Sequence, residues 1–114
     1  MSAADEILKQ RRAELARRFL ERSREDAERI RASLAAAGAD APLECAADLK
    51  MFAHKISGTG ATLGLDSLSE VGRELEMRLS GPSGGAAVTA EELAALRGAN
   101  LLLFREIERL LAQA

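Results

Sequence analysis

Apolar residues recur at three- and four-residue spacing in four segments of this chain, and glycine and proline gather between the segments. That spacing places side chains on one face of an α-helix. Alanine, leucine, arginine and glutamate, which all favour helix, dominate the composition. The pattern therefore predicts an all-α protein.

The four predicted helices run from about 2 to 37, from about 41 to 63, from 66 to 80, and from 89 onward. Ser2 and Asp66 are the expected N-terminal caps, Pro42 suits a first turn, and Thr89-Ala90-Glu91-Glu92 reads as a capping box. Glycine marks the expected ends at 38, 64 and 81. The residues expected to face the core are Leu8, Leu15, Phe19, Ala27, Ile30, Leu34, Leu49, Phe52, Ala53, Ile56, Leu63, Leu68, Val71, Leu75, Leu79, Leu93, Leu96, Asn100, Leu103, Phe104, Ile107 and Leu111.

Four amphipathic helices with short connections predict one domain over residues 1–114, an antiparallel up-and-down four-helix bundle. The first helix would span roughly 50 Å, more than the other helices can cover. A bend in it, or a separate short N-terminal helix, is therefore an open alternative. Asn100 lies on an apolar stripe, where we expect it to be buried and bonded to backbone or to another helix.

The net charge of −2 and the near absence of aromatic residues argue against a nucleic-acid binder. Arginines of the first helix alternate with acidic residues, so a solvated face with ion pairs is the favoured interpretation over a nucleic-acid or membrane site. The chain has no apolar run of membrane-spanning length and no signal-peptide pattern at its start. We therefore expect a cytoplasmic protein that binds neither nucleic acid nor membrane. We also expect a monomer, because the chain already supplies four helices. One cysteine and one histidine predict no metal site and no cofactor on this chain.

His54, the only histidine, falls roughly 150° from the centre of the apolar stripe of its helix. The ring is therefore expected on the solvent face, where an exposed neutral imidazole is a competent nucleophile. Lys55 lies beside it in sequence. The residues one turn before or after it on the same side are Lys50, Met51, Ser57, Gly58 and Ala61.

A lone surface histidine is more often a solvated side chain than a site. The glycines that follow it, Gly58 and Gly60, shift this balance because each costs a helix roughly 1 kcal/mol relative to alanine. The simplest explanation is a partner that approaches the helix closely at the imidazole. Lysine ammonium groups at Lys50 and Lys55 could stabilise a phosphoryl group on the ring.

The run Ala53-His54-Lys55-Ile56-Ser57-Gly58, followed by Leu63-Gly64-Leu65, Leu68 and Glu74-Leu75-Glu76, resembles the histidine phosphotransfer (HPt) domain. The resemblance covers about 25 residues in detail, and the four-helix pattern extends it over the rest of the chain. It implies that His54 accepts a phosphoryl group from an aspartyl phosphate and passes it to another aspartate. The partners would be receiver domains of a hybrid histidine kinase or a response regulator.

The same resemblance implies a phosphocarrier without ATP-dependent kinase activity, with Mg²⁺ held by the receiver. Gly58 would let the receiver approach the ring, and the neighbouring residues would stabilise the phosphoryl group or dock the partner. The family often has lysine three residues after the histidine, where this chain has Ser57. Charge stabilisation would then come from Lys50 or Lys55, with the Ser57 hydroxyl as a donor.

Two other functions fit the sequence. The first is a helical module that binds a response regulator or another partner without transferring phosphate. The second is a dimeric core like that of a histidine kinase, although such cores are built from two helical hairpins and this chain already supplies four helices. Loss of function in a His54→Gln variant separates the relay from simple binding.

Overall fold

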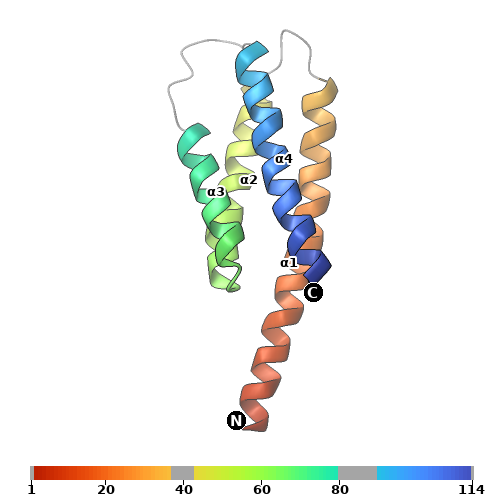
Figure 1. The fold of residues 1–114 in the computed structure, drawn as a ribbon, viewed down its shortest axis with the longest axis vertical. Coiled ribbons are helices and arrows are strands. Elements are labelled where there is room, and N and C mark those ends of the chain that lie inside the picture. Colours follow the sequence, from red (N-terminus) through yellow and green to blue (C-terminus); the bar gives the residue numbers. More distant parts are fainter. Residues whose placement is uncertain (1, 37–42, 80–89, 114) are drawn as a thin grey trace.

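The computed structural model describes residues 2–36, 43–79 and 90–113, without the side chains of 43–45. They form four helices: α1 (Ala3–Ala36), α2 (Leu43–Thr62), α3 (Asp66–Leu79) and α4 (Ala90–Gln113). Successive helices run in opposite directions, and α2 lies beside α3 while α1 lies beside α4 (Figure 1). This confirms the predicted all-α, up-and-down four-helix bundle.

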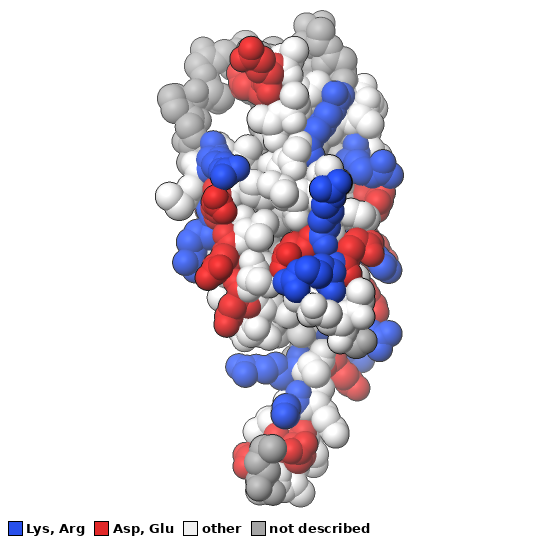
Figure 2. Space-filling model, viewed as in Figure 1, with Lys and Arg blue, Asp and Glu red and all other residues white. Residues whose placement is uncertain are grey.

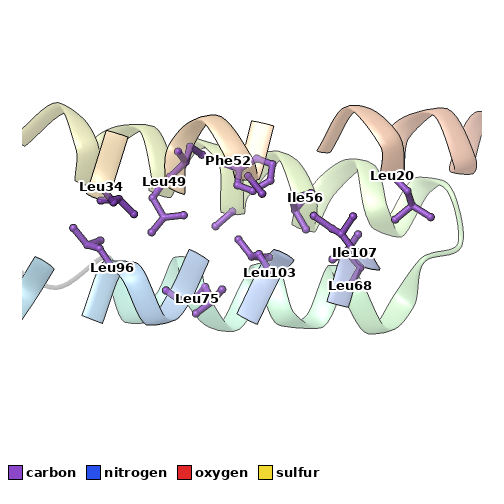
Figure 3. Close-up of a cluster of buried hydrophobic side chains, with 14 of the residues drawn as sticks. Leu20, Leu34, Leu49, Phe52, Ile56, Leu68, Leu75, Leu96, Leu103 and Ile107 are labelled. Carbon is purple, nitrogen blue, oxygen red and sulfur yellow. The ribbon is translucent and has the colours of Figure 1, made fainter. Parts of the chain in front are cut away.

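Most of the core comes from the predicted apolar stripes, brought together at the bundle axis (Figure 3). Leu20 and Ala99 join it without having been predicted, whereas Leu63, which was expected there, is only partly buried and lies outside the cluster. Leu34, Leu49, Ile56, Leu68, Leu103 and Ile107 have almost no exposed surface. Each fully buried aliphatic side chain contributes about 1.5–3 kcal/mol relative to an exposed one. With few aromatic residues available, this interlocking of leucine and isoleucine holds the four helices together.

The first helix has the predicted extent, but the burial of its first half differs from the prediction. α1 is a single helix of 34 residues, with no separate N-terminal helix, and its first half extends beyond the end of the bundle (Figure 1). Leu8 and Leu15 were expected in the core but are 66% and 54% exposed, because no other helix reaches them. Burial in α1 begins at Leu20.

The helix ends follow familiar capping chemistry. The Ser2 hydroxyl accepts a hydrogen bond from the Asp5 amide at 3.2 Å, which confirms Ser2 as the cap of α1. After α2, Gly64 has φ of 76°; its amide donates to the Ala61 carbonyl, and the Leu65 amide donates to Gly60. This Schellman arrangement needs the left-handed conformation that glycine adopts readily.

Asp66 is in the first turn of α3, not at its cap: the Leu65 carbonyl accepts the Ser69 amide, so Leu65 occupies the cap position. An acidic residue in this turn still complements the helix dipole. The other expected caps and stops, at Gly38, Pro42, Gly81 and Thr89, lie outside the described residues.

Two polar side chains of α4 tie it to the backbone of α1. Asn100 is buried, and its amide donates to the Ala27 carbonyl at 3.1 Å, which confirms the expected role of this residue. Arg97 donates through Nε and Nη2 to the Leu34 carbonyl in the last turn of α1. A cation at a helix C-terminus is favourable, and α1 has no basic residue of its own in that turn.

Within the described part of the chain, no helix combines the length and apolarity needed to cross a bilayer.

Candidate functional site

His54 lies on the outward face of α2, and its side chain is 77% exposed. Leu49, Phe52, Ala53 and Ile56 of the same helix are buried on the opposite side. The imidazole is therefore on the solvent face that the helical spacing predicted, supported by a helix whose other face is fixed in the core.

A carboxylate from the neighbouring helix holds the ring. Oε1 of Glu76, on α3, lies 2.7 Å from Nδ1 of His54. A carboxylate only accepts hydrogen bonds, so this contact places a proton on Nδ1. In the neutral ring, Nε2 is then the nitrogen with the free lone pair. The carboxylate fixes both the tautomer and the orientation of the imidazole.

Sequence reasoning did not assign Glu76 to the site, although it lies in the stretch that carries the family resemblance. Its side chain is 29% exposed, so the bond to His54 is only partly screened by water. Periodicity within one helix does not reveal which residues of two helices meet. The structure shows that Glu76 of α3 meets His54 of α2.

Gly72 explains why α3 can approach so closely. A Cβ at this position would lie 2.9 Å from the Ala53 carbonyl, from Cγ2 of Ile56 and from the Ser57 amide. Real Cβ atoms essentially never approach other atoms so closely, and two of the three neighbours are backbone atoms of α2. The signal was present in the sequence, because Gly72 falls on the apolar stripe of α3 between Leu68 and Leu75.

The two glycines singled out from the sequence differ in their surroundings. An added Cβ at Gly58 would meet no atom within 4 Å, so Gly58 leaves open space one turn after His54. Gly60 is buried against α3, where an added Cβ would lie 3.5 Å from the Ser69 amide. The idea that both glycines serve an approaching partner is wrong for Gly60, since it belongs to the seam between α2 and α3.

Ser57 lies on the edge of this same seam. It is partly buried, and its carbonyl accepts a hydrogen bond from the Ser69 hydroxyl at 2.7 Å. Ala61, by contrast, is exposed. The outward surface around His54 is thus flat on the side toward the end of α2, where Gly58 and Ala61 carry little or no side chain.

On the other side of the ring, the neighbouring side chains are longer and two of them are charged. Met51 is 72% exposed and Lys50 is exposed. Lys55 Nζ lies 3.8 Å from Asp26 Oδ2 on α1, so this lysine leans toward α1. Lys50 forms no ion pair with any residue in the described ranges.

An open groove of about 670 Å³ runs along this flank, lined by residues of α1 and α2 together with Glu76. Met51, Phe52, Lys50, Lys55 and His54 are among its walls. The structure therefore brings His54, Lys50, Met51 and Lys55 to one surface with Gly58 and Ala61. Ser57 is at the edge of that surface, nearer to α3.

The arrangement provides one exposed, oriented nucleophile with basic groups nearby and open space beside it. A family model described as the Hpt domain matches residues 14–114. No curated protein and no solved structure matches the chain. Hpt domains are phosphocarrier modules, not kinases, that act in histidine phosphotransfer within phosphorelays and interact with receiver domains. Because the match covers most of its length, this chain belongs to the Hpt domain family.

Proposed function

We propose that His54 is the phosphoacceptor and relays a phosphoryl group between the aspartates of receiver domains. The observation that carries this proposal is the hydrogen bond between Nδ1 of His54 and Glu76, on a side chain that is otherwise open to solvent. It leaves Nε2 as the nucleophile and holds the ring for an incoming partner.

In the proposed step, the Nε2 lone pair attacks the phosphorus of an aspartyl phosphate. An N–P bond forms while the bond from phosphorus to the carboxylate oxygen breaks, and the electron pair leaves with the aspartate. The ring gains positive charge, and Glu76, which accepts the Nδ1 proton in a hydrogen bond, stabilises that charge. The reverse sequence delivers the phosphoryl group to the next receiver.

The receiver supplies Mg²⁺ and most of the catalytic groups in this proposal. This chain supplies the nucleophile and a docking surface, in which Gly58 and Ala61 allow close approach and Met51 offers exposed apolar contact. Lys50 is the cation that can swing toward the phosphoryl group without giving up an ion pair to a described residue. Lys55 must first leave Asp26, and Ser57 offers a hydroxyl only from the edge of the surface.

The test is phosphotransfer from a phosphorylated receiver domain to the wild-type chain and to a His54→Gln variant. We expect acid-labile, base-stable label on the wild type and none on the variant, since no second histidine is available. Circular dichroism checks that the variant is folded. We expect it to be, because the exposed side chain of His54 contributes little to the core. Label on His54→Gln would refute the assignment.

A receiver-binding assay separates the relay from the module that only binds. In the relay, His54→Gln abolishes transfer and leaves binding to the receiver largely intact. If the wild type binds several receivers but takes label from none, the chain is a binding module and the relay proposal fails.

A further inference from the structure

The first half of α1 stands clear of the bundle. Every residue from Ser2 to Arg18 is exposed except Ala16, which is partly so, and burial begins only at Leu20. At 1.5 Å per residue this segment, which we call the α1 arm (residues 2–18), extends about 25 Å. Figure 1 shows it projecting past the C-terminal end of α4. The Hpt family match begins at residue 14, so most of the arm lies outside the matched region.

The arm carries apolar side chains that none of the described residues covers. Ile7, Leu8 and Leu15 are 52%, 66% and 54% exposed. Leu8 and Leu15 are seven residues apart, two helical turns, and they share a face with Ala4. Repetition of leucine at this interval on a helix that has left its own core is typical of a helix that packs against another helix.

The distribution of charged residues along the arm favours one kind of partner. The tip is acidic, with Asp5 and Glu6, and the end near the bundle is basic, with Arg17 and Arg18. Figure 2 shows carboxylates at the tip and basic side chains between the tip and the bundle. A second arm in the same direction would oppose like charges. A second arm in the opposite direction places the acidic tip of each copy beside the basic end of the other.

We propose that the α1 arm is an interface between two copies of this chain, paired antiparallel about a two-fold axis between Arg11 and Arg12. In this pairing Leu8 of one copy faces Leu15 of the other, and Asp5 lies level with Arg18 of the other copy, across the leucine seam. Each contact occurs twice, as two-fold symmetry requires. Lys9 of one copy lies level with Glu14 of the other, nearer to the axis than the leucine pair.

The same geometry limits the strength of the dimer. Arg11 and Arg12 of both copies gather around the axis, and their repulsion opposes association unless the long side chains extend into solvent. The arm has only about 17 residues, of which one face meets the partner, fewer than the roughly 20–30 residues a side of a standard interface. The dimer is therefore weak and concentration-dependent. None of the residues around His54 belongs to the arm, so this inference does not depend on the proposed function.

The first experiment is sedimentation equilibrium of the full chain over a range of concentrations, with Leu8→Glu and Leu15→Glu. Both side chains are exposed in the single chain, so neither change disturbs the bundle. We expect the wild type to associate and each variant to weaken association by about tenfold or more, since each dimer carries the change twice. Leu102→Glu, at a leucine of α4 that is 50% exposed, is the matched control and leaves association unchanged.

Charge reversal tests the antiparallel direction. Asp5→Arg and Arg18→Glu each place like charges together and weaken the dimer, whereas the double variant restores the pair and recovers association. A wild type that is monomeric at every concentration, as the four predicted helices led us to expect, overturns the proposal. So does a dimer that dissociates with Leu102→Glu but not with Leu8→Glu, or one that the double variant fails to restore.

Discussion

An added Cβ at Gly72 would lie 2.9 Å from the carbonyl oxygen of Ala53, the residue that precedes His54. The backbones of α2 and α3 therefore pack directly against each other behind the proposed phosphoacceptor. Glu76 is one turn beyond Gly72 on α3, and its carboxylate reaches Nδ1 of His54. The absence of a side chain at one buried position thus sets the distance between His54 and its orienting carboxylate.

Gly72→Ala should destabilise the bundle by about 1–3 kcal/mol, because the new methyl group must push backbone atoms apart. This cost exceeds the gain of about 1 kcal/mol that alanine brings to a helix. Urea unfolding measures the change. Gly98→Ala on α4 is the matched control: a Cβ there meets nothing within 4 Å, so that variant should gain stability. A stability gain in both variants would contradict the close-packing argument.

The helical pattern was sufficient to predict the four helices, their buried faces and the exposure of His54, because all three depend on periodicity within a helix. It failed at Leu8 and Leu15, which share the stripe of buried residues but lie beyond the reach of the other helices. It also missed Glu76, because the register between α2 and α3 depends on the close packing at Gly72. The pattern of residues within one helix predicts neither how far the neighbouring helices extend nor the register in which they pack against it.

Glu106 joins α3 to α4 and should make stability depend on pH. It accepts a hydrogen bond from the Ser67 hydroxyl at 2.8 Å, and Arg109 Nε donates to its other oxygen at 3.1 Å. The Arg109 hydrogen bond lowers the pKa of Glu106 below its ordinary value of 4.5, against the opposing effect of burial. The folded state therefore favours the charged form, which contributes stability above pH 4.5 that is lost as the pH falls through the lowered pKa.

We accordingly expect Glu106→Gln to lose about 1 kcal/mol at neutral pH, the net size of one hydrogen bond, and to lose less on acidification than the wild type. Denaturant unfolding at a series of pH values measures both. Glu70→Gln, at an exposed carboxylate of α3 without a partner among the described residues, serves as the control. Parallel pH curves for wild type and Glu106→Gln would show that another carboxylate carries the dependence.

Gly58→Ala should raise the stability of the bundle while lowering the rate of phosphotransfer. Its methyl group meets no atom of the described residues within 4 Å, so the helix should gain about 0.5–1 kcal/mol. The same methyl group occupies the open space beside His54, and a receiver that docks there should transfer its phosphoryl group more slowly. The comparison is with Gly98→Ala, which should gain similar stability and keep the wild-type rate. Equal rates in the two variants would mean that the receiver does not approach over Gly58.

Glu76→Gln should lower the rate of phosphotransfer by about tenfold, equivalent to about 1.4 kcal/mol in the barrier. The amide either accepts from or donates to Nδ1, so the ring is no longer held in one tautomer, and it brings no charge to balance the imidazolium that forms. Stability should change by less than about 1 kcal/mol, since His54 is largely exposed. The ring ¹⁵N shifts of His54 report the tautomer directly, and a structural role alone would leave them unmoved. Glu74→Gln, two residues earlier on α3 and bonded to Arg78 instead of His54, should keep both the rate and the shifts.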